Sequence, residues 1–146
     1  MENSYRTTFE IQSPPERIFT AISQQLGDWW GKQDKVIEEK GTIFKVAWGE
    51  PWYQFKVIHF IPNQAMSWAC IDANQKINGL SGVEKEWVGT KVHWKLEDLG
   101  PNQSRLNFEH EGLVPDFLCF DFCSATWERF LKDGLVTYLK TKESAT

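Results

Sequence analysis

The stretch WERFLKDGLVTYL, Trp127–Leu139, carries apolar side chains at helical spacing. Positions i, i+3, i+4, i+7, i+8, i+11 and i+12 are occupied by Trp127, Phe130, Leu131, Gly134, Leu135, Tyr138 and Leu139. This pattern predicts one long helix from about Asp121 to Lys142, which would span roughly 30 Å at 1.5 Å per residue. Because one whole face of that helix is apolar, it must be buried against another part of the fold.

Upstream of this helix the hydrophobic period is two, which is typical of β-strands. The predicted strands are Tyr5–Ile11, Val36–Lys40, Ile43–Trp48, Trp52–Ile61, Ala65–Asp72, Glu84–Glu97 and Ser104–Glu111. Short connectors between consecutive strands favour antiparallel neighbours, since parallel pairing needs a crossover of a dozen or more residues. A ten-residue strand is about as long as the predicted helix, so a sheet of such strands can cover it fully.

The segment after the first strand is predicted to be helical. Ser13–Glu16 (SPPE) has the order of a helix start, with Ser as N-cap, a proline at the first helical position and Glu in a capping box. The apolar stripe that follows is Ile18, Phe19, Ile22 and Leu26, and Gly27 is expected to end the helix. Asp28–Gly31 (DWWG) is expected to form a second short helix or turn that carries a tryptophan into the core.

Together these elements predict an α+β fold. A seven-stranded curved antiparallel sheet grips the long C-terminal helix, and one or two short helices follow the first strand. With 146 residues and 41% hydrophobic composition, the chain has the size of a single domain, residues 1–146.

Composition weighs against several classes of partner. The formal net charge is −4 and acidic and basic residues are interleaved, so nucleic acid is not an expected partner. The apolar runs are too short for a membrane span and the N-terminus does not resemble a secretory signal, which predicts a cytoplasmic protein without membrane insertion. Cys70, Cys119 and Cys123 fit a reducing compartment as buried thiols, and their spacing matches no zinc site. No metal or other cofactor is expected.

A sheet that curls around one helix leaves a cavity unless side chains fill it. A dry void of 300 Å³ would cost on the order of 7 kcal/mol at about 24 cal/mol per Å³, so a cavity of that size is expected to hold a ligand. Strand parity and the helical stripe predict its lining: Trp29, Tyr53, Phe55, Val57, Met66, Trp68, Glu86, Val88, Val92, Trp94, Phe108, His110, Trp127, Phe130, Leu131 and Leu135. An apolar lining with few polar groups is typical of a small-molecule site.

The chain resembles the START-like (SRPBCC) superfamily, which has the helix-grip fold, and within it the branch named after the activator of heat-shock protein 90 ATPase homologues. The matching stretches are IQSPPERIFTAISQQLGDWW (11–30), FKVIHFIPNQAMSW (55–68), GTKVHWKLEDL (89–99), SRLNFEHEGL (104–113) and TWERFLKDGLVTYL (126–139). They cover nearly the whole chain in order. The resemblance implies the helix-grip fold and an apolar cavity, and the name of the branch implies contact with a chaperone.

Two polar sets allow an alternative to plain binding. His110 could orient a ligand or act as a general base, or could be a buried histidine satisfied by the protein. Glu86 and Asp72 could form an acid/base pair at the cavity mouth, or could be solvated carboxylates at strand ends. Gly79–Gly82 (GLSG) is expected to be a mobile lid. No set of Ser, His and Asp or of Cys and His has a spacing that suggests a nucleophile, which weighs against an enzyme.

Three classes of function therefore remain at this stage. The first is binding of a small hydrophobic, aromatic or lipid-like ligand in the cavity, with tryptophans stacked on it. The second is a cofactor-independent cyclase, dehydratase or hydrolase. The third is a co-chaperone-like module that acts through its surface, and a homodimer is also left open.

Overall fold

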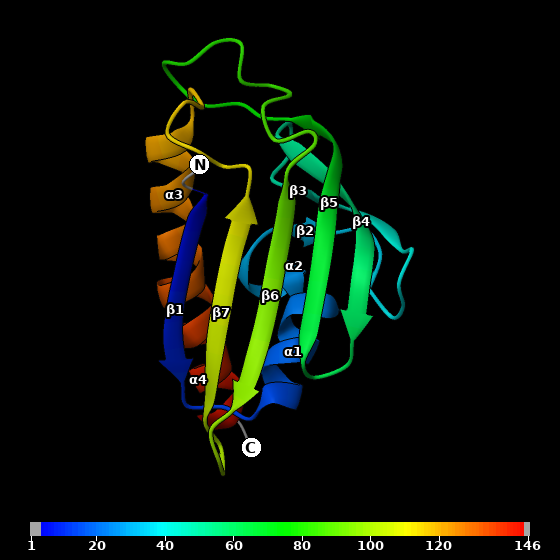
Figure 1. Ribbon diagram of the computed structural model, residues 1–146, viewed down its shortest axis with the longest axis vertical. Coiled ribbons are helices and arrows are strands. Elements are labelled where there is room, and N and C mark those ends of the chain that lie inside the picture. The colour runs from blue at the N-terminus through cyan, green and yellow to red at the C-terminus, as the bar shows by residue number, and fades with distance from the viewer. Residues whose placement is uncertain (1–3, 145–146) are drawn as a thin grey trace.

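One antiparallel sheet forms the framework of the computed structural model, which describes residues 4–144. Its seven strands follow the order β1-β7-β6-β5-β4-β3-β2 (Figure 1). The strands are β1 (Tyr5–Ile11), β2 (Lys32–Gln33), β3 (Ile43–Ala47), β4 (Trp52–Ile61), β5 (Ala65–Asn74), β6 (Lys91–Asp98) and β7 (Ser104–Glu111). All six pairings between neighbours are antiparallel, as the short connectors predict.

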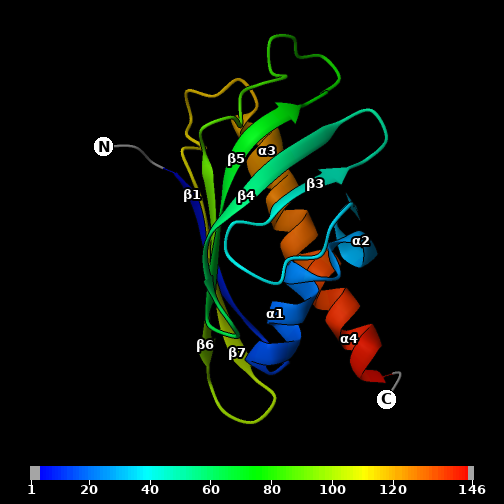
Figure 2. The same ribbon diagram turned by 90° about the vertical axis from the view of Figure 1, so that its right-hand side faces the viewer.

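The helices lie on one side of this sheet (Figure 2). They are α1 (Pro15–Ser23), α2 (Leu26–Trp29) and a C-terminal run made of α3 (Phe120–Glu128), the π-helix η1 (Arg129–Leu135) and α4 (Val136–Ser144). The C-terminal run lies along the sheet, so the predicted grip of a sheet on a long helix is confirmed. In the described part of the chain, no helix is long and apolar enough to cross a membrane.

The π-helical segment in the middle of the long helix has a reason in the sequence. The buried residues of its stripe, Trp127, Leu131, Leu135 and Leu139, are each four residues apart. In an α-helix such steps drift by about 40° each, because four residues turn 400°. The wider turns of η1 offset this drift and keep the row of side chains on the sheet.

The predicted strand Val36–Lys40 is wrong. The edge strand is β2, which pairs with β3, and residues 36–40 form a connection outside the sheet. Gln33 explains this placement, because its side-chain amide donates to the carbonyl of Ser23 (2.8 Å) and accepts from the backbone of Leu26 (3.2 Å). These bonds hold the chain beside α1 and α2 before residue 36 is reached.

The predicted strand Glu84–Glu97 starts too early. The observed strand β6 begins at Lys91, and residues 84–89 form turns. Gly89 has φ +93°, a left-handed conformation that ends extended pairing at this point. Parity counted through Gly89 is therefore invalid: Val88, expected to face inward, is exposed, and Trp87 is buried instead.

The predicted start and end of the first helix also need correction. The N-cap is Pro14, with extended backbone and no side-chain cap, because the helix begins at the second of two prolines. The Ser13 hydroxyl is buried without a partner among the described residues. At the other end, α1 stops at Ser23 and Gly27 lies inside α2. The expected short helix carrying a tryptophan inward is confirmed as α2, after which Trp30 is buried too.

Indole rings fill most of the space between the sheet and the helices. Trp30 stacks on Trp127 at 5.1 Å between ring centroids, and Trp127 stacks on Trp87 at 5.8 Å. Trp68 and Trp94 complete this layer on the sheet side and are fully buried. The large open interior expected from the sequence is thus occupied by the chain's own side chains. A smaller cavity lies beside this layer.

Candidate functional site

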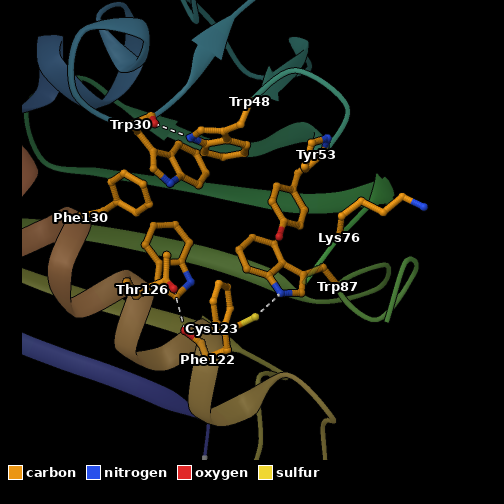
Figure 3. Close-up of a pocket in the computed structure, with 11 residues that line it drawn as sticks. Trp30, Trp48, Tyr53, Lys76, Trp87, Phe122, Cys123, Thr126 and Phe130 are labelled. Atoms are coloured by element: carbon orange, nitrogen blue, oxygen red, sulfur yellow. Dashed lines mark hydrogen bonds between the residues drawn. The ribbon is translucent and has the colours of Figure 1, made fainter. Parts of the chain in front are cut away.

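A cavity of about 190 Å³ opens to solvent between α3, the β3–β4 connection and the segment 75–90 that joins β5 to β6 (Figure 3). Its lining residues are Trp30, Trp48, Pro51, Tyr53, Lys76, Trp87, Phe122, Cys123, Thr126, Trp127 and Phe130. Most of these side chains are aromatic, and rings from four separate parts of the chain converge on the same space. Such a lining suits a flat apolar molecule.

Trp30 and Trp48 form one wall of the cavity. The indole N–H of Trp48 donates to the carbonyl of Trp30 (2.7 Å), and their rings meet edge to face at 5.3 Å. Gly31 makes this approach feasible, because a Cβ there would lie 2.6 Å from Trp48 Cε2 and 2.7 Å from Val46 Cγ1. The small residue after the tryptophan pair therefore lets the β3–β4 connection close on the core.

Gly31→Ala should lower the free energy of unfolding by about 2 kcal/mol, because the added methyl must displace Trp48 and Val46 from a packed region. Urea denaturation followed by circular dichroism measures the change. Gly27→Ala is the matched control: a Cβ there meets only the backbone nitrogen of Gln33, at 3.8 Å. Equal effects of the two substitutions would contradict this account of the wall.

Gln75 ties the opposite wall together. Its side-chain oxygen accepts from the hydroxyl of Tyr53 (2.6 Å) and the thiol of Cys123 (3.3 Å), and its amide donates to the carbonyl of Val83 (3.0 Å). Burial raises the pKa of the Tyr53 hydroxyl, and a hydrogen bond with Cys119 together with burial raises the pKa of the Cys123 thiol. Both groups are therefore neutral near pH 7, and the thiol is a poor nucleophile.

Asp72 and Glu86 do not meet as a pair. The Lys85 ammonium donates to Asp72 (2.7 Å) and holds the pKa of that carboxyl below its usual range. The carboxylate of Glu86 accepts from the backbone N–H groups of Leu118 (2.6 Å) and Cys119 (3.1 Å). Glu86 lies in the turns after residue 83 rather than on a strand, so its role is to fasten this segment to the chain just before α3.

His110 is a buried histidine whose two ring nitrogens are both used by the protein. Trp127 Nε1 can only donate, so His110 Nδ1 is the acceptor of that bond (3.0 Å). The Nε2–H then donates to Thr90 Oγ1 (2.8 Å), and the Thr90 hydroxyl donates to the carbonyl of Trp87 (2.6 Å). Burial lowers the pKa of His110 to about 3. The imidazole is neutral and has no free nitrogen with which to orient a ligand.

The structure places the lining predicted from the sequence in three groups. Tyr53, Trp127 and Phe130 lie at the cavity. Most of the others are buried in the core that surrounds it: Trp29, Phe55, Val57, Met66, Trp68, Val92, Trp94, Phe108, His110, Leu131 and Leu135. Glu86 and Val88 lie in the turns before β6 and face neither the core layer nor the cavity.

Several lining residues escaped the sequence analysis. Trp87 was missed because the predicted strand ran through Gly89, which assigned Trp87 to the outer face. Trp48 and Pro51 lie at a turn, where the alternation of strand residues does not predict which way a side chain points. Lys76 lies on the connection before β6, whose path no periodic pattern describes. A usable signal was Trp48 beside the Gly49–Pro51 turn, because an aromatic residue at a tight turn next to the inward-facing Tyr53 can reach the same face of the sheet.

A separate hydrogen-bonded row lies on the outer face of the sheet, away from the cavity. Ser67 Oγ and His93 Nδ1 are 2.8 Å apart, and His93 Nε2 and Glu111 Oε1 are also 2.8 Å apart. Ser67 is the direct cross-strand partner of His93, and Glu111 on β7 reaches it diagonally, two residues from the direct partner of His93. Sequence spacing does not reveal this set, because the residues are far apart along the chain.

Known proteins share this architecture. The Aha1 dimer from Colwellia psychrerythraea is 22% identical, with a TM-score of 0.71 over 89% of this chain and 91% of that one. The structure of MLL2253 from Mesorhizobium loti is 20% identical, with a TM-score of 0.73 over 94% and 98% of the two chains. This chain has the helix-grip fold. PFC0360w, an HSP90 activator from Plasmodium falciparum, has the same fold at 16% identity, with a TM-score of 0.66 over 89% and 91%.

The START-like resemblance is thus confirmed at the level of the helix-grip fold. No protein-family model matches the sequence. No curated protein matches it either. At these sequence identities the solved structures establish the fold alone, and a shared fold does not imply a shared function.

Proposed function

We propose that this protein binds a small, flat, apolar molecule in the cavity between α3, the β3–β4 connection and the segment 75–90. The observation that carries the proposal is the aromatic lining of an open cavity of about 190 Å³. An engineered cavity of about 150 Å³ holds benzene, so a one- or two-ring molecule fits this size. The partly exposed lining rings of Trp48 and Phe130 can pack against such a molecule, and an aromatic pair adds about 0.5–1.5 kcal/mol beyond burial.

The polar groups at the cavity favour binding over acid/base chemistry. Tyr53 and Cys123 are both held neutral and both donate to Gln75. His110 lies behind Trp127 with its two nitrogens occupied. General acid/base catalysis works best with a group that titrates near the operating pH and reaches the substrate, and these three do not meet that description.

A thermal-shift panel tests the proposal. A ligand present at 100 times its dissociation constant should stabilise the protein by about 2.7 kcal/mol and raise the melting temperature by several degrees. Aromatic one- and two-ring compounds should produce this shift, whereas linear alkanols of similar size should produce less of it.

Thr126→Phe should abolish the shift, because Thr126 lines the cavity and a benzyl group there would occupy it. Ala125→Phe is the matched control, since Ala125 is exposed one position along α3 and is not part of the lining. A ligand shift that survives Thr126→Phe would place the binding elsewhere. The absence of a shift with every aromatic compound would overturn the proposal.

A role in chaperone contact and a homodimer both remain predictions. They draw on the names of the Aha1 dimer and of the HSP90 activator, which describe those proteins. The cavity of this chain neither requires nor opposes them.

A further inference from the structure

One hydrogen-bond donor at the cavity has no acceptor in the described part of the protein. The indole Nε1–H of Trp30 has no hydrogen-bond partner among residues 4–144, and it is not one of the fully enclosed unpaired atoms of that part of the chain. Figure 3 shows this nitrogen directed away from Trp48 and into the pocket. A buried donor that still has access to the cavity calls for an acceptor on whatever occupies it.

The other polar groups of the lining already have partners. Trp48 donates to the carbonyl of Trp30, and Trp87 Nε1 lies 3.4 Å from the sulfur of Cys123. The hydroxyl of Thr126 donates to the carbonyl of Phe122 (2.7 Å). The hydrogen-bond donors of the lining that lack an acceptor are therefore the indole N–H of Trp30 and the ammonium group at the mouth.

The charged residue of the lining is a lysine at the mouth, and Figure 3 shows its ammonium group extending away from the aromatic rings. Lys76 is the charged residue among the described lining residues, it is exposed, and it forms no ion pair within the described chain. The lining contains no Asp or Glu. An anion near Lys76 would gain a counter-charge, and a cation would meet a like charge.

The charge of Lys76 helps to decide whether the aromatic cavity binds an anion or a cation. A ring-lined pocket attracts quaternary ammonium groups through cation–π contacts. The lining of this cavity contains no carboxylate that could pair with a cation. The unpaired N–H of Trp30 and the ammonium group of Lys76 both disfavour a bound cation.

We propose that the occupant is a one- or two-ring aromatic anion, of the aryl carboxylate class. Its ring packs among the tryptophans, and its carboxylate lies at the mouth within the field of Lys76. Trp30 Nε1 donates to a further acceptor at the inner end of the ligand where the ligand has one. This inference rests on the proposed function, since it names the chemistry of the ligand for the same cavity.

Three planar probes with the same naphthalene ring test it by isothermal titration: 2-naphthoate, 2-naphthamide and 2-naphthamidinium, which are anionic, neutral and cationic. The wild-type protein should bind 2-naphthoate about fivefold more tightly than the amide, the size expected of one partly solvated ion pair. It should bind the cation more weakly than the amide. Raising the salt concentration should reduce the preference, because exposed charges are screened.

Charge reversal at the mouth gives the sharper result. Lys76→Glu should reverse the order, so that the cation binds more tightly than the anion, and Lys76→Met should bring the anion and the amide close together. Lys91→Glu makes the same change in net charge at an exposed position of β6 that is not part of the lining. It should leave the wild-type order unchanged.

The outcomes separate this inference from the proposed function. If the amide binds and the anion binds no better, or if Lys76→Glu leaves the order intact, the cavity binds aromatic rings and the inference about charge is wrong. If none of the three probes binds, both proposals are overturned. A reversal with Lys91→Glu equal to that with Lys76→Glu would show that net charge, rather than the mouth, sets the preference, which also overturns the inference.

Discussion

Trp127→Ala should lower the free energy of unfolding by about 3–5 kcal/mol, the range found when a large buried aromatic side chain is truncated. Trp127 lies where the helix meets the sheet, with ring centroids at 5.1 Å from Trp30 and 4.5 Å from Phe108. Its loss would also leave the Nδ1 of His110 without its donor. Single domains are stable by only about 5–15 kcal/mol, so the variant should be close to unfolding at 37 °C.

Urea denaturation monitored by far-UV circular dichroism measures this effect. Trp127→Phe keeps a ring in place and removes the N–H donor, so it should lie between the wild type and the alanine variant. Trp52→Ala is the control for losing an indole, because Trp52 is only partly buried, on the far side of β4 from the core. A loss below about 1 kcal/mol for Trp127→Ala would show that the indole layer does not hold the helix to the sheet.

Acidification should destabilise the wild-type protein by about 3 kcal/mol through His110 alone between pH 7 and pH 4. The folded state holds the pKa of this histidine at about 3, against an ordinary value of 6.5. Below pH 6.5, His110 is protonated in the unfolded chain but stays neutral in the folded protein. The contribution of His110 to stability is therefore complete above pH 6.5 and is lost as the pH falls toward 3.

His110→Asn isolates this effect, because the amide oxygen of Asn can still accept from Trp127 Nε1 and the side chain does not titrate. The measured quantity is the slope of unfolding free energy against pH, which should be steeper in the wild type by about 1.4 kcal/mol per pH unit between pH 6 and pH 4. Groups common to both proteins cancel in this comparison. Parallel slopes would mean that His110 can take up a proton without unfolding.

The sequence was a good guide wherever a long periodic pattern had one interpretation. The stripe from Trp127 to Leu139 predicted a buried helix, and the alternation in β4 and β7 gave both strands their observed bounds. Leu106 and Phe108 face the core as their parity predicts. Predictions for such segments are reliable because many residues agree on which face is buried. A shift of the strand by one residue would expose that whole face, so a single register is favoured.

The candidate site could not be predicted in the same way, for two physical reasons. Gly89, with its positive φ, resets the direction of every side chain before it, so Trp87 and Val88 exchanged places relative to the expected parity. Volume was the second reason. Parity says which side chains face inward, but it does not say that the indoles of Trp30 and Trp68 fill the interior beside the cavity.

The stack of indoles has an optical consequence. Trp87 and Trp127 lie nearly parallel, 14° apart, and Trp30 also stacks on Trp127, with ring centroids 5.1 Å apart. Transition dipoles this close exchange excitation, so the layer should absorb and emit as a coupled set of chromophores. An occupant touching any one of these rings would perturb the emission of all of them, and the protein thereby carries its own fluorescent reporter of occupancy.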